Sequence, residues 1–208
     1  MAFITLEGIE GSGKSTQARR LAEALGAGAL LTQEPGGTTL GRSIRGLLLE
    51  HRDQPMSPAA EALLFFADRA QHVAEVIRPA LRAGRHVISD RHTDSSLAYQ
   101  GLARGLDLRL LRALAELATG GLRPDLTVLI DVPVAEGLAR VGRRGASDRL
   151  EAERVEFHER VRAGYLRLAA EEPSRWAVVD GRGGEDEVAA RVIEVVESRG
   201  LRASHGVR

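Results

Sequence analysis

The stretch from Gly8 to Ser15, GIEGSGKS, limits what this chain can fold into more than any other part of the sequence. It has the pattern G-x-x-x-x-G-K-[ST] and lies between an apolar run, FITLEG, and an amphipathic segment, KSTQARRLAEALG. In this pattern the glycines let successive backbone N–H groups surround a phosphate, and the helix N-terminus that follows adds a favourable dipole. The sequence therefore predicts a nucleoside-triphosphate loop between a buried strand and a helix.

Lys14 is the only lysine among the 29 lysine and arginine residues of the chain. A compact ammonium fits inside a closed backbone loop, whereas a planar guanidinium is too broad. In such loops the lysine reaches the β- and γ-phosphates, and the hydroxyl that follows, here Ser15, is a magnesium ligand. A glycine-rich turn with a chance lysine is the structural alternative. The predicted phosphate-binding residues are Gly8, Ile9, Glu10, Gly11, Ser12, Gly13, Lys14, Ser15 and Thr16.

Short apolar runs alternate with longer amphipathic segments along the chain. This alternation implies a single domain over 1–208 with a parallel sheet and helices on both faces. The final residues, 201–208, are expected to be a frayed tail, and Pro79 is expected to kink the long third helix. Strands are predicted over 3–8, 29–32, 86–90, 126–132 and 176–180, and helices over 14–26, 39–51, 57–84, 107–121, 134–141, 151–172 and 185–200.

The composition argues against several functional classes of protein. The formal net charge is zero, so a basic surface for nucleic acid or membranes is not expected. No apolar run approaches the ~18 residues of a membrane span, and MAFITLEG lacks the basic start of a signal peptide. The chain has no cysteine, so a cytoplasmic location without disulfides is expected. It has no asparagine for the N-K-x-D motif of a GTPase and no LSGGQ-like signature of a transport ATPase.

Four further motifs follow the loop in order: EPGGTTLGRSIRGLLL, LLFFADR, VISDRHTDSSLAYQG and DRLEAERVEFHERVRAGYLRLA. Together with GIEGSGKST they resemble the bacterial thymidylate kinases, up to about residue 172. The resemblance implies a three-layer P-loop NTPase sandwich with a five-stranded parallel sheet. It also implies transfer of phosphate from ATP to dTMP with Mg²⁺, by a homodimer. Two alternatives remain: a kinase of another nucleoside monophosphate or of a deoxynucleoside, and a nucleotide-binding regulatory module without turnover.

Asp90 and Arg91 follow an apolar strand, at the end where parallel sheets bind ligands. An arginine there can clamp a phosphate with two hydrogen bonds. The resemblance implies that Asp90 helps to hold magnesium and that Arg91 holds the acceptor monophosphate. On pattern alone Asp131, which ends LTVLID, is a rival to Asp90.

Phe65 and Arg69 lie four residues apart on a predicted helix and therefore share a face. The resemblance implies that Phe65 stacks on thymine and that Arg69 bonds its carbonyl edge, although both could instead be core residues. It also assigns Glu10 to the acceptor 3′-hydroxyl, where an anion inside a phosphate loop needs a compensating cation or hydroxyl. The remaining contacts that it implies are Arg45 to phosphate, Ser96 and Gln100 to the base, and Tyr99 against a 2′-hydroxyl.

The arginine- and glycine-rich segment ARVGRRGASDRLE lies between two predicted helices. It is predicted to form a mobile lid over the donor phosphates at about 141–150, with a charged solvated loop as the alternative. Arg140 and Arg144 align best with the lid arginines of the family, whereas Arg143 is out of register. The chain departs from the family at Gln33, where an arginine usually precedes EPGG.

Overall fold

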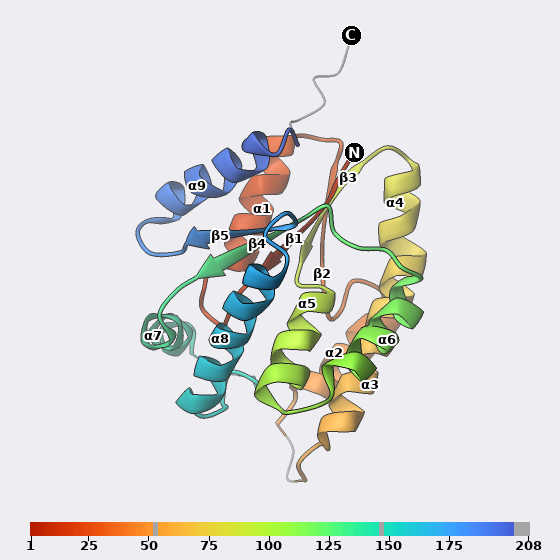
Figure 1. The fold of residues 1–208 in the computed structure, drawn as a ribbon, viewed down its shortest axis with the longest axis vertical. Coiled ribbons are helices and arrows are strands. Elements are labelled where there is room, and N and C mark those ends of the chain that lie inside the picture. The colour runs from red at the N-terminus through yellow and green to blue at the C-terminus, as the bar shows by residue number, and fades with distance from the viewer. Residues whose placement is uncertain (52–53, 146–147, 202–208) are drawn as a thin grey trace.

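The protein is described by a computed structural model over residues 1–51, 54–145 and 148–201. Its five parallel strands form one sheet in the order β2-β3-β1-β4-β5 (Figure 1). The predicted fold class is confirmed, with each strand within two residues of its expected bounds. The strands are β1 (Phe3–Glu7), β2 (Ala29–Gln33), β3 (His86–Asp90), β4 (Leu126–Asp131) and β5 (Trp176–Asp180).

Helices cover both faces of this sheet (Figure 1). They are α1 (Lys14–Leu25), α2 (Thr39–Leu49), α3 (Pro58–His72), α4 (Arg78–Arg82), α5 (Thr93–Ser96), α6 (Leu108–Thr119), α7 (Val134–Arg144), α8 (Val155–Glu171) and α9 (Glu185–Ser198), with π-helical segments η1 (Val73–Ile77) and η2 (Leu97–Ala103). The helix predicted over 151–172 begins later, at Val155, and the one predicted over 134–141 continues to Arg144.

Alternate residues of each strand face opposite layers. On β1, Ile4 packs into a cluster with α1 and α9, whereas Phe3 packs against η1 on the other face. On β4, Val128 and Ile130 join the first cluster, and Leu129 joins a third one with α6 and α8. The continuous apolar strands are thus buried on both sides, as expected for a parallel sheet.

Two helical features differ from the sequence prediction. The predicted helix over 57–84 contains η1 directly before α4, so the change in geometry lies in the turn preceding Pro79 rather than at the proline itself. Proline lacks an N–H and its ring crowds the carbonyl one turn earlier, which a wider turn relieves. No helix was predicted over 93–103, where α5 continues into η2. π-Helical turns are common at functional sites.

The carboxyl ends of the strands lie at one edge of the sheet. Leu6 of β1 is paired with Asp90 of β3, so the loop after β1 and the residues after β3 emerge side by side. No helix in the described part of the chain is long and apolar enough to cross a membrane.

Candidate active site

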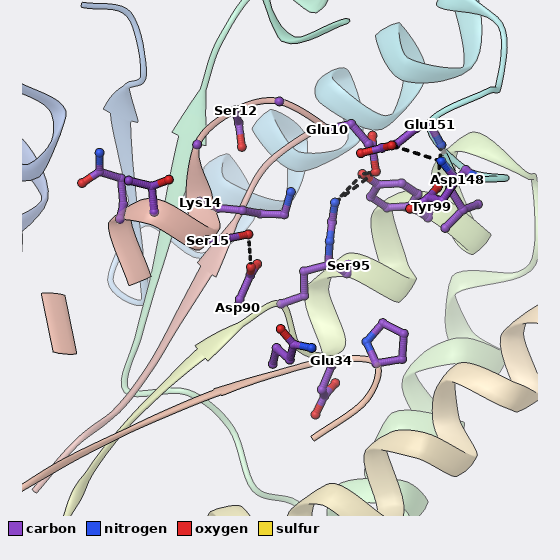
Figure 2. A pocket seen from close by; sticks show the side chains of 18 of the residues that line it. Glu10, Ser12, Lys14, Ser15, Glu34, Asp90, Ser95, Tyr99, Asp148 and Glu151 are labelled. Carbon is purple, nitrogen blue, oxygen red and sulfur yellow. Dashed lines mark hydrogen bonds and ion pairs between the residues drawn. The ribbon is translucent and has the colours of Figure 1, made fainter. Parts of the chain in front are cut away.

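A cavity of about 510 Å³ lies at this edge of the sheet (Figure 2). Its walls come from the loop before α1 and the start of α1, the segment after β2, helices α2, α3, α5 and α7, segment η2, the residues that precede α8, and the start of α9. The predicted site residues that line it are Glu10, Gly11, Ser12, Gly13, Lys14, Ser15, Thr16, Arg45, Phe65, Asp90, Arg91, Ser96, Tyr99, Gln100 and Arg140. Gly8, Ile9 and Arg69 lie behind the lining, and the side chain of Arg144 is outside the described part of the structure.

Backbone geometry makes the phosphate loop narrow. Gly8, Gly11 and Gly13 all have positive φ values, which residues other than glycine rarely adopt. A Cβ added at Gly11 would lie 2.0 Å from the carbonyl oxygen of Gly137, so the loop also packs closely against α7. The positive φ values favour glycine at all three positions, and at Gly8 and Gly11 close contacts exclude a Cβ as well, even before a ligand is considered.

Lys14 lies inside this loop with 8% of its surface exposed. Its Nζ donates to the backbone oxygen of Ile9 over 3.2 Å. Burial, and then the charge of Arg91, lower the pKa of Lys14 from 10.5 to about 8. A buried ammonium with too little compensating charge is a suitable partner for the phosphates of a nucleotide.

Ser15 and Asp90 lie side by side below the loop (Figure 2). The hydroxyl of Ser15 donates to one carboxylate oxygen of Asp90. The other oxygen, Oδ1, is buried and has no hydrogen-bond partner among the described residues. A hydroxyl and a carboxylate beside a phosphate loop suit Mg²⁺, which takes few protein oxygens and fills its shell with water and phosphate. Asp131 does not line the cavity; both its oxygens are bound by Arg162, at 2.7 and 2.8 Å.

Glu10 has the compensating groups that an anion in a phosphate loop needs. Its Oε1 accepts hydrogen bonds from Arg91 at 3.0 Å and from the Tyr99 hydroxyl at 2.5 Å. Its Oε2 lies 3.1 Å from Nδ1 of His158, on α8. Although burial raises the pKa of Glu10, the His158 contact and the charge of Arg91 bring it down to about 2. Sequence reasoning missed His158, since it lies 148 residues away in the chain.

Arg91 is held from several sides. Its φ of 72° is the only positive value at a residue other than glycine in the described chain. Besides Glu10 and Tyr99, its guanidinium donates to the Ser95 hydroxyl and the Tyr165 hydroxyl, both at 3.0 Å. With this many partners the guanidinium is fixed before any phosphate arrives.

A buried carboxyl group lies behind this arrangement. Glu7 ends β1 and accepts from Ser95 at 2.6 Å and from Tyr165 at 2.8 Å. Burial, and then the charge of Asp94, raise the pKa of Glu7 to about 7. Glu7 and Tyr165 were not predicted as site residues. The only available signal was an acidic residue ending an apolar strand, which by itself is weak.

Phe65 and Phe66 have different surroundings. Phe65 is half-buried and lines the cavity, whereas Phe66 is 4% exposed and belongs to the core. Arg69 is fully buried, with its guanidinium 5.1 Å from the ring of Phe66. It donates to Glu34 at 2.7 Å and to the Ser96 hydroxyl at 3.0 Å. Arg69 therefore lies directly behind Ser96, which faces the cavity.

Other predicted residues are also held by neighbours. Gln100 donates to Glu61 at 2.9 Å, and Arg45 donates to the backbone oxygen of Pro35 at 2.8 Å. Arg140 donates to the backbone oxygen of Gly181 at 3.2 Å, at the edge of the phosphate loop. Gln33, the departure from the family pattern, is exposed and lines the cavity.

The predicted lid is only partly described. Arg143 is exposed and donates to the backbone oxygen of Ala139 in its own helix, away from the cavity lining. Residues 146–147 and the tail over 202–208 lie outside the described residues. At the far end of the segment, Arg149 donates to Glu61 at 2.6 Å and to the backbone oxygen of Leu48 at 2.9 Å.

Comparison with known proteins agrees with this geometry. A family model described as thymidylate kinase matches residues 6–192. A thymidylate kinase of Desulfovibrio desulfuricans is 50% identical, covering 99% of both chains, and one of Synechococcus is 56% identical, covering 95% of both. A crystal structure of thymidylate kinase from Ehrlichia chaffeensis has a TM-score of 0.78 at 35% identity, covering 94% of this chain and 98% of that one. The chain belongs to the thymidylate kinase family.

Proposed function

We propose that this protein transfers the γ-phosphoryl group of ATP to dTMP, giving ADP and dTDP, with Mg²⁺ as cofactor. The observation that carries the proposal is the pair of cation sites in one cavity. Lys14 lies in the phosphate loop after β1, and Asp90 and Arg91 follow one another at the end of β3, the strand paired with β1; all three line the same cavity. A phosphoryl group passing between two bound nucleotides needs such a pair of sites, because transfer depends mainly on positioning and charge neutralisation.

The donor side of the proposed reaction uses the phosphate loop. The backbone N–H groups and Lys14 hold the β- and γ-phosphates, and Ser15 and Asp90 hold the magnesium ion. When bound, Mg²⁺ neutralises charge on the phosphate oxygens. Arg140 is proposed to contribute further charge, since its guanidinium already lies at the edge of the loop. Arg144 and a closing segment at about 141–150 remain part of the same proposal.

The acceptor side is proposed to bind the monophosphate through Arg91 and Arg45. Arg91 is supported by its four side-chain partners, which leave it rigid and cationic. Phe65 offers a ring face in the cavity wall for stacking on thymine. Glu10 accepts from the sugar 3′-hydroxyl in this proposal. The groups proposed to recognise the base edge and the 2′ position are Arg69, Ser96, Gln100 and Tyr99.

Tyr99 supports the preference for a deoxy sugar. Its hydroxyl is tied to Glu10 and Arg91, and the side chain is 3% exposed, so the ring is not free to turn away. A 2′-hydroxyl next to this fixed ring would have little room. The prediction from this contact is a clear preference for dTMP over its ribose counterpart.

We also propose that the protein is a homodimer in the cytoplasm. Exposed leucines support the dimer because they lie on three helices that pack side by side, α2 with α3 and α3 with α6. On α2 and on α6 they are seven residues apart, which places them on one face of each helix. They are Leu40, Leu47, Leu63, Leu110 and Leu117. Light scattering should give twice the mass of the chain, and a monomer at micromolar concentration would contradict the dimer.

A coupled assay of ADP release across dTMP, dUMP, UMP, CMP, AMP and GMP tests the proposed function. We expect the highest kcat/KM with dTMP. Preference for another monophosphate would favour the alternative of a different nucleotide kinase. Tight nucleotide binding without ADP release would favour a regulatory module. Lys14, Ser15 and Asp90, together with the arginines of the proposed lid, argue against that module, since binding alone does not require a lid.

A further inference from the structure

Glu10 has one acceptor position left for a ligand. A carboxylate has about four lone-pair sites, two on each oxygen. In the described structure Oε1 already accepts from Arg91 and Tyr99, and Oε2 accepts from His158. One site on Oε2 remains, on a side chain that lines the cavity and is 7% exposed.

His158 is the only described side chain that holds Oε2. It is completely buried, in the first turn of α8, and its ring meets that of Phe157 edge-on at 5.7 Å. Its second nitrogen, Nε2, has no hydrogen-bond partner among the described residues, and Glu10 is the only described side chain that forms a hydrogen bond with the ring. Burial lowers the pKa of His158, but the hydrogen bond to Glu10 raises it above the usual value overall. Because an ionised carboxylate can only accept, the Nδ1 that faces Glu10 carries the hydrogen.

Without His158 the carboxylate would have a competing partner. Lys14 is on the same loop, and its charge already acts on Glu10. A buried carboxylate oxygen that loses its donor must find another, because leaving it unpaired is costly. The two cations whose charges act on Glu10, Arg91 and Lys14, are the ones that the phosphates need.

We propose that His158 is a positioning residue for Glu10. It holds Oε2 so that the remaining lone pair faces the acceptor sugar, and it keeps the carboxylate away from Lys14. The ligand group that this position suits is a hydroxyl donor, the sugar 3′-hydroxyl of the monophosphate. This inference rests on the proposed function, because it concerns how the same acceptor is recognised.

Two substitutions of nearly equal shape separate the hydrogen bond from packing. In His158→Asn the amide nitrogen takes the place of Nδ1 and keeps a donor for Glu10, whereas His158→Leu fills similar space without one. The experiment measures kcat/KM for dTMP and for its 3′-deoxy analogue in the unaltered protein and in both variants. The dissociation constant for ATP, by calorimetry, is the control for correct folding.

We expect His158→Leu to lose about tenfold or more of the preference for dTMP over the 3′-deoxy analogue, since hydrogen bonds to charged groups are worth about this much. The loss should be confined to dTMP, and His158→Asn should keep the preference within about threefold. An unchanged preference in His158→Leu, or equal losses in the two variants, would overturn the inference. If the unaltered protein does not phosphorylate dTMP at all, the proposed function itself fails.

Discussion

Replacing Lys14 with methionine should abolish phosphoryl transfer and yet stabilise the protein when no nucleotide is bound. Burial is the main reason why the pKa of Lys14 is lowered from 10.5 to about 8. A shift of one pKa unit corresponds to about 1.4 kcal/mol. The lowered pKa of Lys14 therefore means that holding the ammonium in the empty loop costs about 3 kcal/mol of stability at pH 7. The substitution removes this cost together with one hydrogen bond, to Ile9, worth about 1 kcal/mol.

The net gain of about 2 kcal/mol should raise the melting temperature by about 4–8 °C for a chain of this length. Thermal unfolding at pH 7 without nucleotide, followed by circular dichroism, measures it. Arg19→Met on the same helix is a matched control, because its side chain is 55% exposed and its ion pair with Glu23 is of little weight. We expect that control to change the melting temperature by no more than about 2 °C.

The buried Lys14 also predicts how the stability of the folded protein changes with pH. Between about pH 8 and pH 10.5 the unfolded chain binds more protons at Lys14 than the folded chain does, so the unaltered protein gains stability as the pH rises. The advantage of Lys14→Met should therefore shrink across this range. A variant that is no more stable than the unaltered protein at pH 7, or whose advantage does not change with pH, would refute the reasoning about the buried charge.

Four further substitutions test the acceptor and donor sides. Phe65→Ala should weaken dTMP binding by about 1–3 kcal/mol in calorimetry and leave ATP binding unchanged; equal losses would make Phe65 a core residue. Arg69→Ala should lower the dTMP:dCMP ratio of kcat/KM and, because Glu34 loses a buried partner, reduce the unfolding free energy by about 3–5 kcal/mol. Arg144→Ala, Arg140→Ala and the pair should each lower kcat and kcat/KM together with little change in KM, with Arg144 as the first candidate and Arg140 as the second. A defect confined to the KM for ATP would contradict a role for these arginines in catalysis.

The parts of the site that could be predicted are those contained in a short stretch of chain. The phosphate loop contains its glycines and its lysine in one short stretch. This stretch and its position after a buried strand were therefore sufficient to predict the loop from the sequence. Asp90 was predictable because it ends an apolar strand, although pattern alone could not separate it from Asp131. The structure separates them, since Asp131 is fully engaged by Arg162.

The parts that were missed depend on residues brought together from distant elements. His158 and Tyr165 come from α8 and reach groups on the phosphate loop and beyond β3. No local pattern marks either one, because an apolar helix face with an embedded histidine is also typical of an ordinary core. The helix over 93–103 was missed because it begins with TDSS, residues of weak helix propensity, and is stabilised by tertiary contacts, most of all with α8.

The most direct measurement of the central claim follows the phosphate itself. The protein is incubated with ATP labelled at the γ-phosphate, magnesium and dTMP, and the products are separated, with Lys14→Met as the matched inactive variant. We predict that the label appears in dTDP, in equal amount to the ADP formed, and that the variant forms none. Label released as inorganic phosphate, or label in dTDP formed equally well by the variant, would contradict the account.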